Sequence, residues 1–417
     1  MKKVLSIFLT SAIILTLSGC DNNDSSKTMK LTDLYSQLDE QVERAKAKDY
    51  PNIVFEDGFK AKMPNVDKLY ELSFKRSEIS SKDCYSAFDG WFDMLFSDIY
   101  SEEDKKELYH FSCENDDGPQ YNNDLPYPHN QPLVDDYRDK IFDNSLSCSE
   151  FLIDTDKAYL EVKYGGYAYG LSFGKAMELY CDYLEEGEPI GFWNPLYNKY
   201  EIVAGYKDFS TDISYKLRDK EVSLKEAAET VERFITDNNF GGGTQLKPHV
   251  PQIYAVDLQD GYYGYFFKLN YTYKGVEVLV DTSTNSNGYH GTSYGRDYYR
   301  MPGSSFMLES GRPDSLVCFD TALNVEELEE YGSVISLENA VEILSSSFAD
   351  GLELHISSAE LMYAQYYTVP MDLPHNWIRP QFQTDIVWHF EAVNALENLS
   401  YDICINAIDG SCSYLKS

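Results

Sequence analysis

Two stretches of the chain place their apolar residues at the spacing of a single helix face. They begin at Ser223 and Ser336, and Leu, Ala and Glu recur at the same offsets after each serine. Apolar residues follow at i, i+3, i+4 and i+7, which is the period of an amphipathic helix. A serine suits the N-cap, and Glu226 would complete a capping box with Ser223. The pattern predicts two capped helices, each with one buried stripe.

A β-hairpin pattern follows the first helix. Residues 265–273 alternate apolar and polar side chains, which predicts a strand with one buried face. Lys274-Gly275 then provides a two-residue turn, and a turn of this length fixes the register of the two strands. The turn predicts three pairs on one face: Tyr273 with Val276, Tyr271 with Val278, and Leu269 with Val280.

The second helix is followed by the same order of elements. Strands are predicted at 359–367, at 387–393 and on both sides of Asp409-Gly410. His389 alternates with Trp388, so we expect His389 at the surface. A two-residue turn would point Cys404 and Cys412 to opposite faces, whereas a longer loop could bring them to one face. Each half of the repeat is therefore predicted to be a helix lying on an antiparallel sheet.

The second copy resembles a known family. The segments "ISLENAVEIL" and "INAIDG", with a strand ending near Tyr363 and another carrying Trp388, look like PepSY-like domains and the YycI-type regulatory domains of Gram-positive envelopes. The resemblance covers about 335–417, extends more weakly to 221–282, and departs from the family in a long insert between Tyr363 and Trp388. It implies a cystatin-like unit, in which a helix packs on a curled antiparallel sheet. It also implies a non-catalytic extracytoplasmic module that contacts other proteins.

The N-terminus carries the features of an export signal. Lys2 and Lys3 precede an apolar run over 4–17 that is too short for a confident membrane span. The run ends in Leu17-Ser18-Gly19-Cys20, which resembles the lipobox of bacterial lipoproteins. That resemblance implies cleavage before Cys20, diacylglycerol on its sulfur and further acylation such as palmitate. We therefore expect a lipid anchor on the extracytoplasmic face of the cell membrane, followed by a polar tether.

The net charge changes the choice of partners. The chain has 69 Asp and Glu against 35 Lys and Arg, a formal charge of −34. A nucleic-acid partner requires a basic surface, so this class is excluded. Repulsion from anionic lipid headgroups means that the lipid would have to hold the protein at the membrane. The expected partner is a protein of the membrane or envelope.

Cysteine and acidic patterns give no metal or cofactor site. There are 8 cysteines, and without Cys20 an odd number remains, so they cannot all pair internally. No CxxC is present, which argues against zinc and thioredoxin-type chemistry. An alternation of oxygen ligands lacks the glycine and terminal glutamate of a calcium loop; it comprises Asp281, Ser283, Asn285 and Asn287. His355, His375 and His389 have no metal-ligand spacing. We expect neither metal nor cofactor.

One motif suggests catalysis. Gly170-Leu171-Ser172-Phe173-Gly174 matches the G-x-S-x-G elbow that exposes a nucleophilic serine between a strand and a helix. The alternating parallel βα units that the elbow requires are missing from the pattern. The other interpretation is a turn in which Ser172 caps a following helix at 175–186.

The N-terminal half is predicted to mix helices and strands. Helices are expected over 31–48, 86–96 and 101–111, and a hairpin over 151–164. The predicted organisation is a signal peptide (1–19), a tether (20–30), an N-terminal α+β domain (31–215), a first PepSY-like unit (216–325) and a second, YycI-type unit (326–417). The fold class is α+β, with two tandem helix-on-sheet units.

The predicted function is that of a membrane-anchored binding or regulatory module without catalysis. Two alternatives remain open. One is a serine hydrolase that uses Ser172, and the other is a lipoprotein that captures carbohydrate or peptide through exposed tyrosines.

Overall fold

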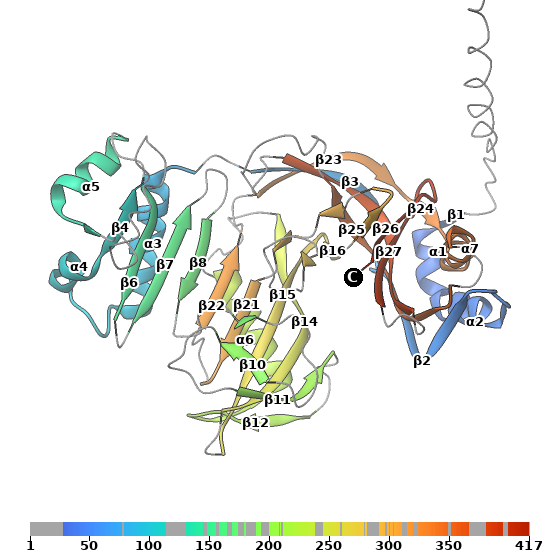
Figure 1. Cartoon of the computed structure of the whole chain (residues 1–417), viewed down its shortest axis with the longest axis horizontal. Coiled ribbons are helices and arrows are strands. Elements are labelled where there is room, and N and C mark those ends of the chain that lie inside the picture. The colour runs from blue at the N-terminus through green and yellow to red at the C-terminus, as the bar shows by residue number, and fades with distance from the viewer. Residues whose placement is uncertain are drawn as a thin grey trace, which may run out of the picture.

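The computed structural model combines helices with a larger number of strands, in agreement with the predicted α+β class (Figure 1). It describes residues 28–76, 79–113, 131–144, 148–155, 158–164, 169–173, 179–180, 189–192, 200–207, 209, 212–237, 245–258, 261–278, 280–281, 292–296, 298–299, 301–302, 304–310, 315–319, 323–348, 352–366, 381–394 and 399–416. None of the helices in these ranges is both long enough and apolar enough to cross a bilayer.

The helices are α1 (Leu31–Ser36), α2 (Leu38–Ala47), α3 (Ser81–Phe96), α4 (Glu102–Leu108), α5 (Asp135–Phe142), α6 (Leu224–Asp237) and α7 (Leu337–Ser347). The strands of the first half are β1 (Thr28–Lys30), β2 (Ile53–Lys62), β3 (Leu69–Arg76), β4 (His110–Cys113), β5 (Gln131–Pro132), β6 (Cys148–Asp154), β7 (Tyr159–Tyr164), β8 (Tyr169–Phe173), β9 (Leu179–Tyr180), β10 (Pro189–Phe192) and β11 (Tyr200–Tyr206). Those of the second half are β12 (Ser214–Lys216), β13 (Glu221–Ser223), β14 (Leu246–Asp257), β15 (Tyr263–Tyr273), β16 (Val276–Val278), β17 (Val280–Asp281), β18 (Thr292–Tyr294), β19 (Tyr298–Tyr299), β20 (Met301–Pro302), β21 (Ser304–Leu308), β22 (Ser315–Phe319), β23 (Leu323–Tyr331), β24 (Ser333–Ile335), β25 (Leu354–Tyr366), β26 (Gln381–Asn394), β27 (Leu399–Asn406) and β28 (Cys412–Lys416).

The second copy of the repeat forms a helix on antiparallel strands. Strands β25, β26, β27 and β28 pair in that order, and α7 packs against β27 and β28. Ser336 caps α7 as predicted, because its hydroxyl accepts from the Asn339 amide. The loop between β27 and β28 is longer than two residues, yet Ile405 pairs with Cys412. Cys404 and Cys412 therefore point to opposite faces.

Both ends of the chain build this region. β1 pairs with β24, β2 runs parallel to β25, and β3 lies between β23 and β26. Helix α2 contacts α7, and Lys48 Nζ lies 2.6 Å from a carboxylate oxygen of Glu338. Figure 1 shows α1, α2 and α7 together at one end of the molecule. Residues 28–30, predicted as the end of the tether, are strand β1, and together with residues 31–76, predicted as part of the N-terminal domain, they share ladders with residues 323–416.

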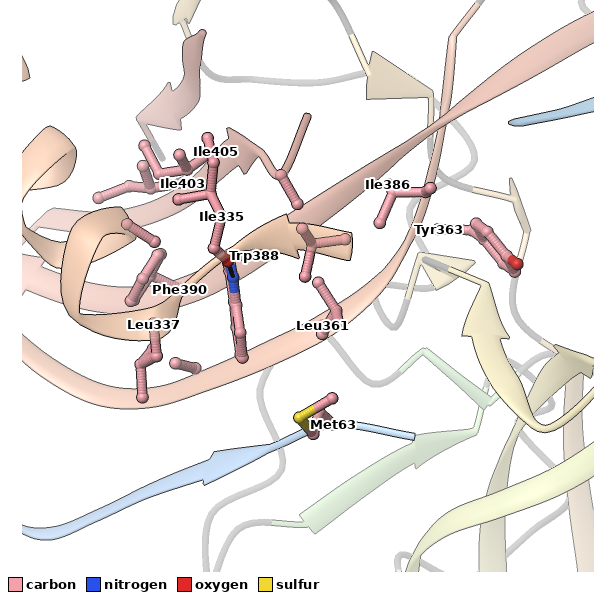
Figure 2. Packing of buried hydrophobic residues seen from close by; sticks show 14 of the residues in the cluster. Met63, Ile335, Leu337, Leu361, Tyr363, Ile386, Trp388, Phe390, Ile403 and Ile405 are labelled. Atoms are coloured by element: carbon pink, nitrogen blue, oxygen red, sulfur yellow. Dashed lines mark hydrogen bonds between the residues drawn. The ribbon is translucent and has the colours of Figure 1, made fainter. Parts of the chain in front are cut away.

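The core beneath α7 is apolar and closed around Trp388 (Figure 2). The indole Nε1 of Trp388 donates a 2.8 Å hydrogen bond to the carbonyl oxygen of Ile335. Leu361 and Phe390 face the same core from β25 and β26. The apolar alternation along these strands thus becomes one buried face.

The first copy also forms its helix and hairpin. Helix α6 packs on β14, and Ser223 accepts from the Glu226 amide as the capping pattern predicts. Two of the three predicted hairpin pairs are confirmed, Tyr273 with Val276 and Tyr271 with Val278. Lys274 and Gly275 both have positive φ, as a tight hairpin turn requires.

The third predicted hairpin pair is wrong. Leu269 pairs with Ser304 of β21, and Val280 pairs with Met301 of β20. The hairpin ladder stops at Val278 because β21 takes over the edge of β15 from Leu269 onwards. A local pattern could not reveal this more distant strand.

A third helix lies on strands in the N-terminal half. Helix α3 packs against β6 and β7, with its aromatic stripe in the same core as α6, and Trp91 contacts Phe234 of α6. Strands β7, β8, β22, β21 and β15 pair in succession, so this sheet continues into the sheet under α6. The helix predicted over 175–186 is contradicted where the structure describes it, because Leu179–Tyr180 is strand β9 paired with β10.

Candidate functional site

A row of ionisable side chains crosses the place where the sheets under α6 and α7 meet. Odd-numbered residues of β15 enter both cores, Phe267 under α6 and Tyr273 under α7. Beyond the hairpin, β16 meets β25 through the pair of Val278 with Tyr363. We call this junction between β16 and β25 the joint.

The row lies on the sheet face opposite the α7 core. Each of its residues either neighbours α7-core residues along its own strand or pairs with a residue that does. Because successive side chains of a strand point to opposite faces, these residues lie on the face away from the α7 core. We call this set the polar row: His249 on β14, Glu277 on β16, Glu360 on β25 and His389 on β26. Glu360 and His389 are direct partners in the ladder, and Lys62 at the end of β2 pairs with Glu360 from the other side.

On one side of the joint, His249 and Glu277 form an ion pair. His249 Nε2 lies 3.2 Å from Glu277 Oε1, and Asn270 Nδ2 donates to the other carboxylate oxygen at 3.2 Å. The hydrogen bond with Glu277 raises the pKa of His249 above its ordinary value. Burial alone would raise the pKa of Glu277, but the bonds from His249 and Asn270 outweigh it and lower that pKa. The pair is therefore held as imidazolium and carboxylate.

On the other side of the joint, Glu360 is a half-buried acid without a matching donor. Among the described residues, none gives its carboxylate a hydrogen bond. Burial, and then repulsion by the Glu277 carboxylate, raise the pKa of Glu360 to about 7, although Lys62 and His389 oppose the rise. Two carboxylates thus lie as diagonal neighbours on one face of the joint, Glu277 with a lowered pKa and Glu360 near its midpoint at neutral pH.

His389 is buried, so the prediction that it lies at the surface is wrong. Its side chain is 10% exposed, and Nε2 lies 3.2 Å from a carboxylate oxygen of Asp402 on β27. The alternation correctly turned His389 away from Trp388. That face is nevertheless covered here, because Met362, Val387 and Cys404 form a small buried cluster on it.

The catalytic motif of the sequence lies in a ladder. Ser172 is inside β8, where it pairs with Glu161 of β7 and Val317 of β22, both antiparallel. A strand-to-helix elbow would instead put the serine at the end of a strand. The described backbone therefore lacks the elbow geometry at Ser172.

The remaining predicted positions fall mostly outside the described residues. Cys20, His375, Ser283, Asn285 and Asn287 are not described. Asp281 belongs to the short strand β17, and His355 lies beside Glu353 at 3.0 Å. Within the described residues, no group of three or more His, Cys, Asp or Glu side chains is placed to hold a metal ion.

The sequence analysis did not single out Glu277 and Glu360. A local signal for each exists, because Glu277 interrupts two valines and Glu360 precedes an apolar run. Alternation alone would have turned both away from the core. Their proximity depends on β16 pairing with β25, which joins residues about 85 positions apart.

Comparisons with known proteins give little further guidance. No protein-family model matches the chain, and no curated protein matches it. Among solved structures, the Bacillus megaterium YpeB C-terminal domain is similar over 82% of this chain and 99% of its own, at 12% identity and a TM-score of 0.27. A TM-score this low carries no argument about fold or function.

Proposed function

We propose that the protein is a non-catalytic binding and regulatory module, held at the extracytoplasmic face of the membrane by a lipid on Cys20. The observation that carries the proposal is the pairing of β1 with β24. The first described strand after the lipobox is thereby fixed to the region around α7, so a lipid on Cys20 would hold a rigid body.

The geometry limits how far that body could stand from the bilayer. Thr28 follows Cys20 by eight positions, and an extended chain spans at most about 3.6 Å per residue, or roughly 30 Å in all. The α7 region would therefore be the part nearest the membrane, and α4 and α5 at the other end would project away from it (Figure 1).

Three helix-on-sheet regions support a binding role. We infer that those of α6 and α7 are tandem copies of one PepSY-like unit, since both have a serine-capped helix followed by antiparallel strands. Joined through shared strands, they form an extended surface suited to contacting another protein. In the part of these regions that the structure describes, the polar row is distributed along one sheet face.

The anchor is tested by fractionating bacterial cells that produce the full-length chain. The expected result is that the wild-type protein sediments with membranes and incorporates an alkyne-labelled palmitate, while the Cys20→Ser variant does neither. A matched Cys84→Ser variant should behave as the wild type, because Cys84 is a buried residue of α3. Equal membrane association of wild type and Cys20→Ser would refute the anchor.

The binding role is tested by photocrosslinking in intact cells. A photoreactive residue at Val393, which is exposed on β26, should yield a discrete adduct with one envelope protein. Met94, which is exposed on α3 at the far end of the molecule, is the control position for the same photoreactive residue. The absence of a discrete adduct at both positions would argue against a protein partner.

A further inference from the structure

The joint connects the sheet under α6 with the sheet under α7. Between β16 and β25 the ladder consists of the single pair of Val278 with Tyr363. On the inner face, Tyr271, Tyr273, Val276 and Val278 pack into the α7 core and give the contact its apolar part. On the other face, the register sets Glu277 level with Met362, and Glu360 lies two residues before Met362 on the same face of β25, so the two acids are diagonal neighbours across the joint.

The charges around this pair are unbalanced. The Glu277 carboxylate accepts from two donors, His249 and Asn270. Lys62 of β2 and His389 of β26, by contrast, act on Glu360 electrostatically and not through a hydrogen bond. Glu391 on β26 adds a second negative charge facing Glu360. On the α6 side, Glu232 lies 3.8 Å from His249 Nδ1, and Asp402 of β27 faces His389. Ionised Glu360 is therefore repelled by Glu277 from the far side of the joint.

We propose that the joint is proton-responsive: it tightens when Glu360 is protonated and His249 is charged, and it loosens when both groups lose their protons. Protonation of Glu360 removes its repulsion with the Glu277 carboxylate. Protonation of His249 keeps the imidazolium that pairs with Glu277. The responding element is β16, because it carries Glu277 and, within the described residues, meets β25 through the single ladder pair of Val278 with Tyr363.

Glu360 and His249 act in the same direction. The pKa of Glu360 is raised from 4.5 to about 7, so its contribution to stability is complete below pH 4.5 and is lost as pH rises through about 7. The pKa of His249 is raised above 6.5, so its contribution is complete below pH 6.5 and disappears above the raised value.

Glu277 sets the acidic limit. Its pKa is lowered, so its contribution is present above pH 4.5 and is lost as pH falls through the lowered value. Between about pH 4.5 and 6.5 all three groups favour the closed joint, and the contribution of Glu360 is lost as pH rises through about 7.

Hydrogen exchange of the full-length chain tests the proposal. Protection of amides in a peptide covering β16 is compared at pH 6 and pH 8, after correction for the intrinsic exchange rate, with a peptide covering β6 and β7 as the internal reference. We expect protection of the β16 peptide to fall by about tenfold relative to the reference, the equivalent of one pKa unit that survives solvent screening. Protection that is equal at the two pH values, or that falls equally in both peptides, overturns the proposal.

Three variants assign the response to the polar row. Glu360→Gln imitates the protonated acid and should keep β16 protected at pH 8. Glu277→Gln removes the repulsion from the other side and should also abolish the difference between the two pH values. Glu353→Gln is the control, because Glu353 is an exposed residue just before β25 and should keep the wild-type response. A wild-type response in both Glu360→Gln and Glu277→Gln contradicts the proposal.

Discussion

Trp388 connects the sheet to the start of α7. Its side chain is fully buried, and its Nε1–H donates to Ile335, immediately before the capping Ser336. If phenylalanine replaced Trp388, the buried carbonyl of Ile335 would lose its donor, which costs about 1–3 kcal/mol. The smaller phenyl ring would also leave part of the site unfilled. A single indole therefore contributes both packing and the position of a helix.

We expect Trp388→Phe to lower the free energy of unfolding by about 2–4 kcal/mol, the sum of a lost hydrogen bond and lost packing. Urea unfolding followed by circular dichroism measures this change. Tyr35→Phe is the control, since Tyr35 is 44% exposed and its loss of a hydroxyl should cost less than about 0.5 kcal/mol. An unchanged midpoint in Trp388→Phe would show that the indole bond does not hold α7.

Single residues also mark how far the sequence could predict the site. Alternation placed Trp388 inside and His389 on the opposite face, and both directions are correct. The burial of His389 was missed, because a covered second face depends on what lies above the sheet. Glu360 could not be singled out for the same reason: its raised pKa comes from burial and from Glu277, a residue of another strand.

At the scale of elements, the starts of α3, α4, α6 and α7 are encoded locally by a serine. Ser80 accepts from the Asp83 amide, while the Asp83 carboxylate accepts from the Ser80 amide and hydroxyl. These bonds lower the pKa of Asp83, so the capping box contributes above the usual aspartate range and is lost as pH falls through the lowered pKa. Ser101 with Asp104 repeats the arrangement at α4.

Removal of one cap should have a modest and specific cost. We expect Ser80→Ala to destabilise the protein by about 1 kcal/mol, because the Asp83 amide loses its acceptor and the Asp83 carboxylate loses the hydroxyl donor. Ser80→Thr keeps a hydroxyl and should retain most of the stability. Thermal unfolding at neutral pH distinguishes them, and equal transitions for Ser80→Ala and wild type would contradict the role of the cap.

Other elements could not be predicted from local patterns. The helices beginning after Ser223 and Ser336 were predicted because period and cap agree. The helix predicted over 101–111 ends at Leu108, and His110–Cys113 is strand β4, because its ladder with β6 overrides a weak helical pattern. The tertiary partner therefore decided the outcome where the local signal was short.

At the scale of the whole molecule, the predicted second unit is incomplete by itself. Residues 326–417 lack β2, the parallel neighbour of β25, and β3, which pairs with both β23 and β26. They also lack Leu31, Leu34, Leu72 and Phe74, which are fully buried in the α7 core. Local periodicity carries no information about pairing between segments about 300 residues apart.

A fragment of residues 326–417 should therefore not fold alone. We expect no cooperative thermal transition for it, and recovery of one when residues 28–76 are added through a flexible linker. Differential scanning calorimetry measures both. A cooperative transition of the isolated fragment would mean that residues 28–76 are not required for this core to fold.

The pairing of β1 with β24 also sets the order in which parts of the fold can form during synthesis. Synthesis runs from the N-terminus to the C-terminus, so Thr28–Lys30 emerge from the ribosome long before Ser333–Ile335 are made. Thr28–Lys30 therefore cannot take their place beside β24 until about 300 further residues have been made. Assembly of this edge is thus limited by synthesis of β24, and a nascent chain stalled before Ser333 would leave β1 without its partner strand.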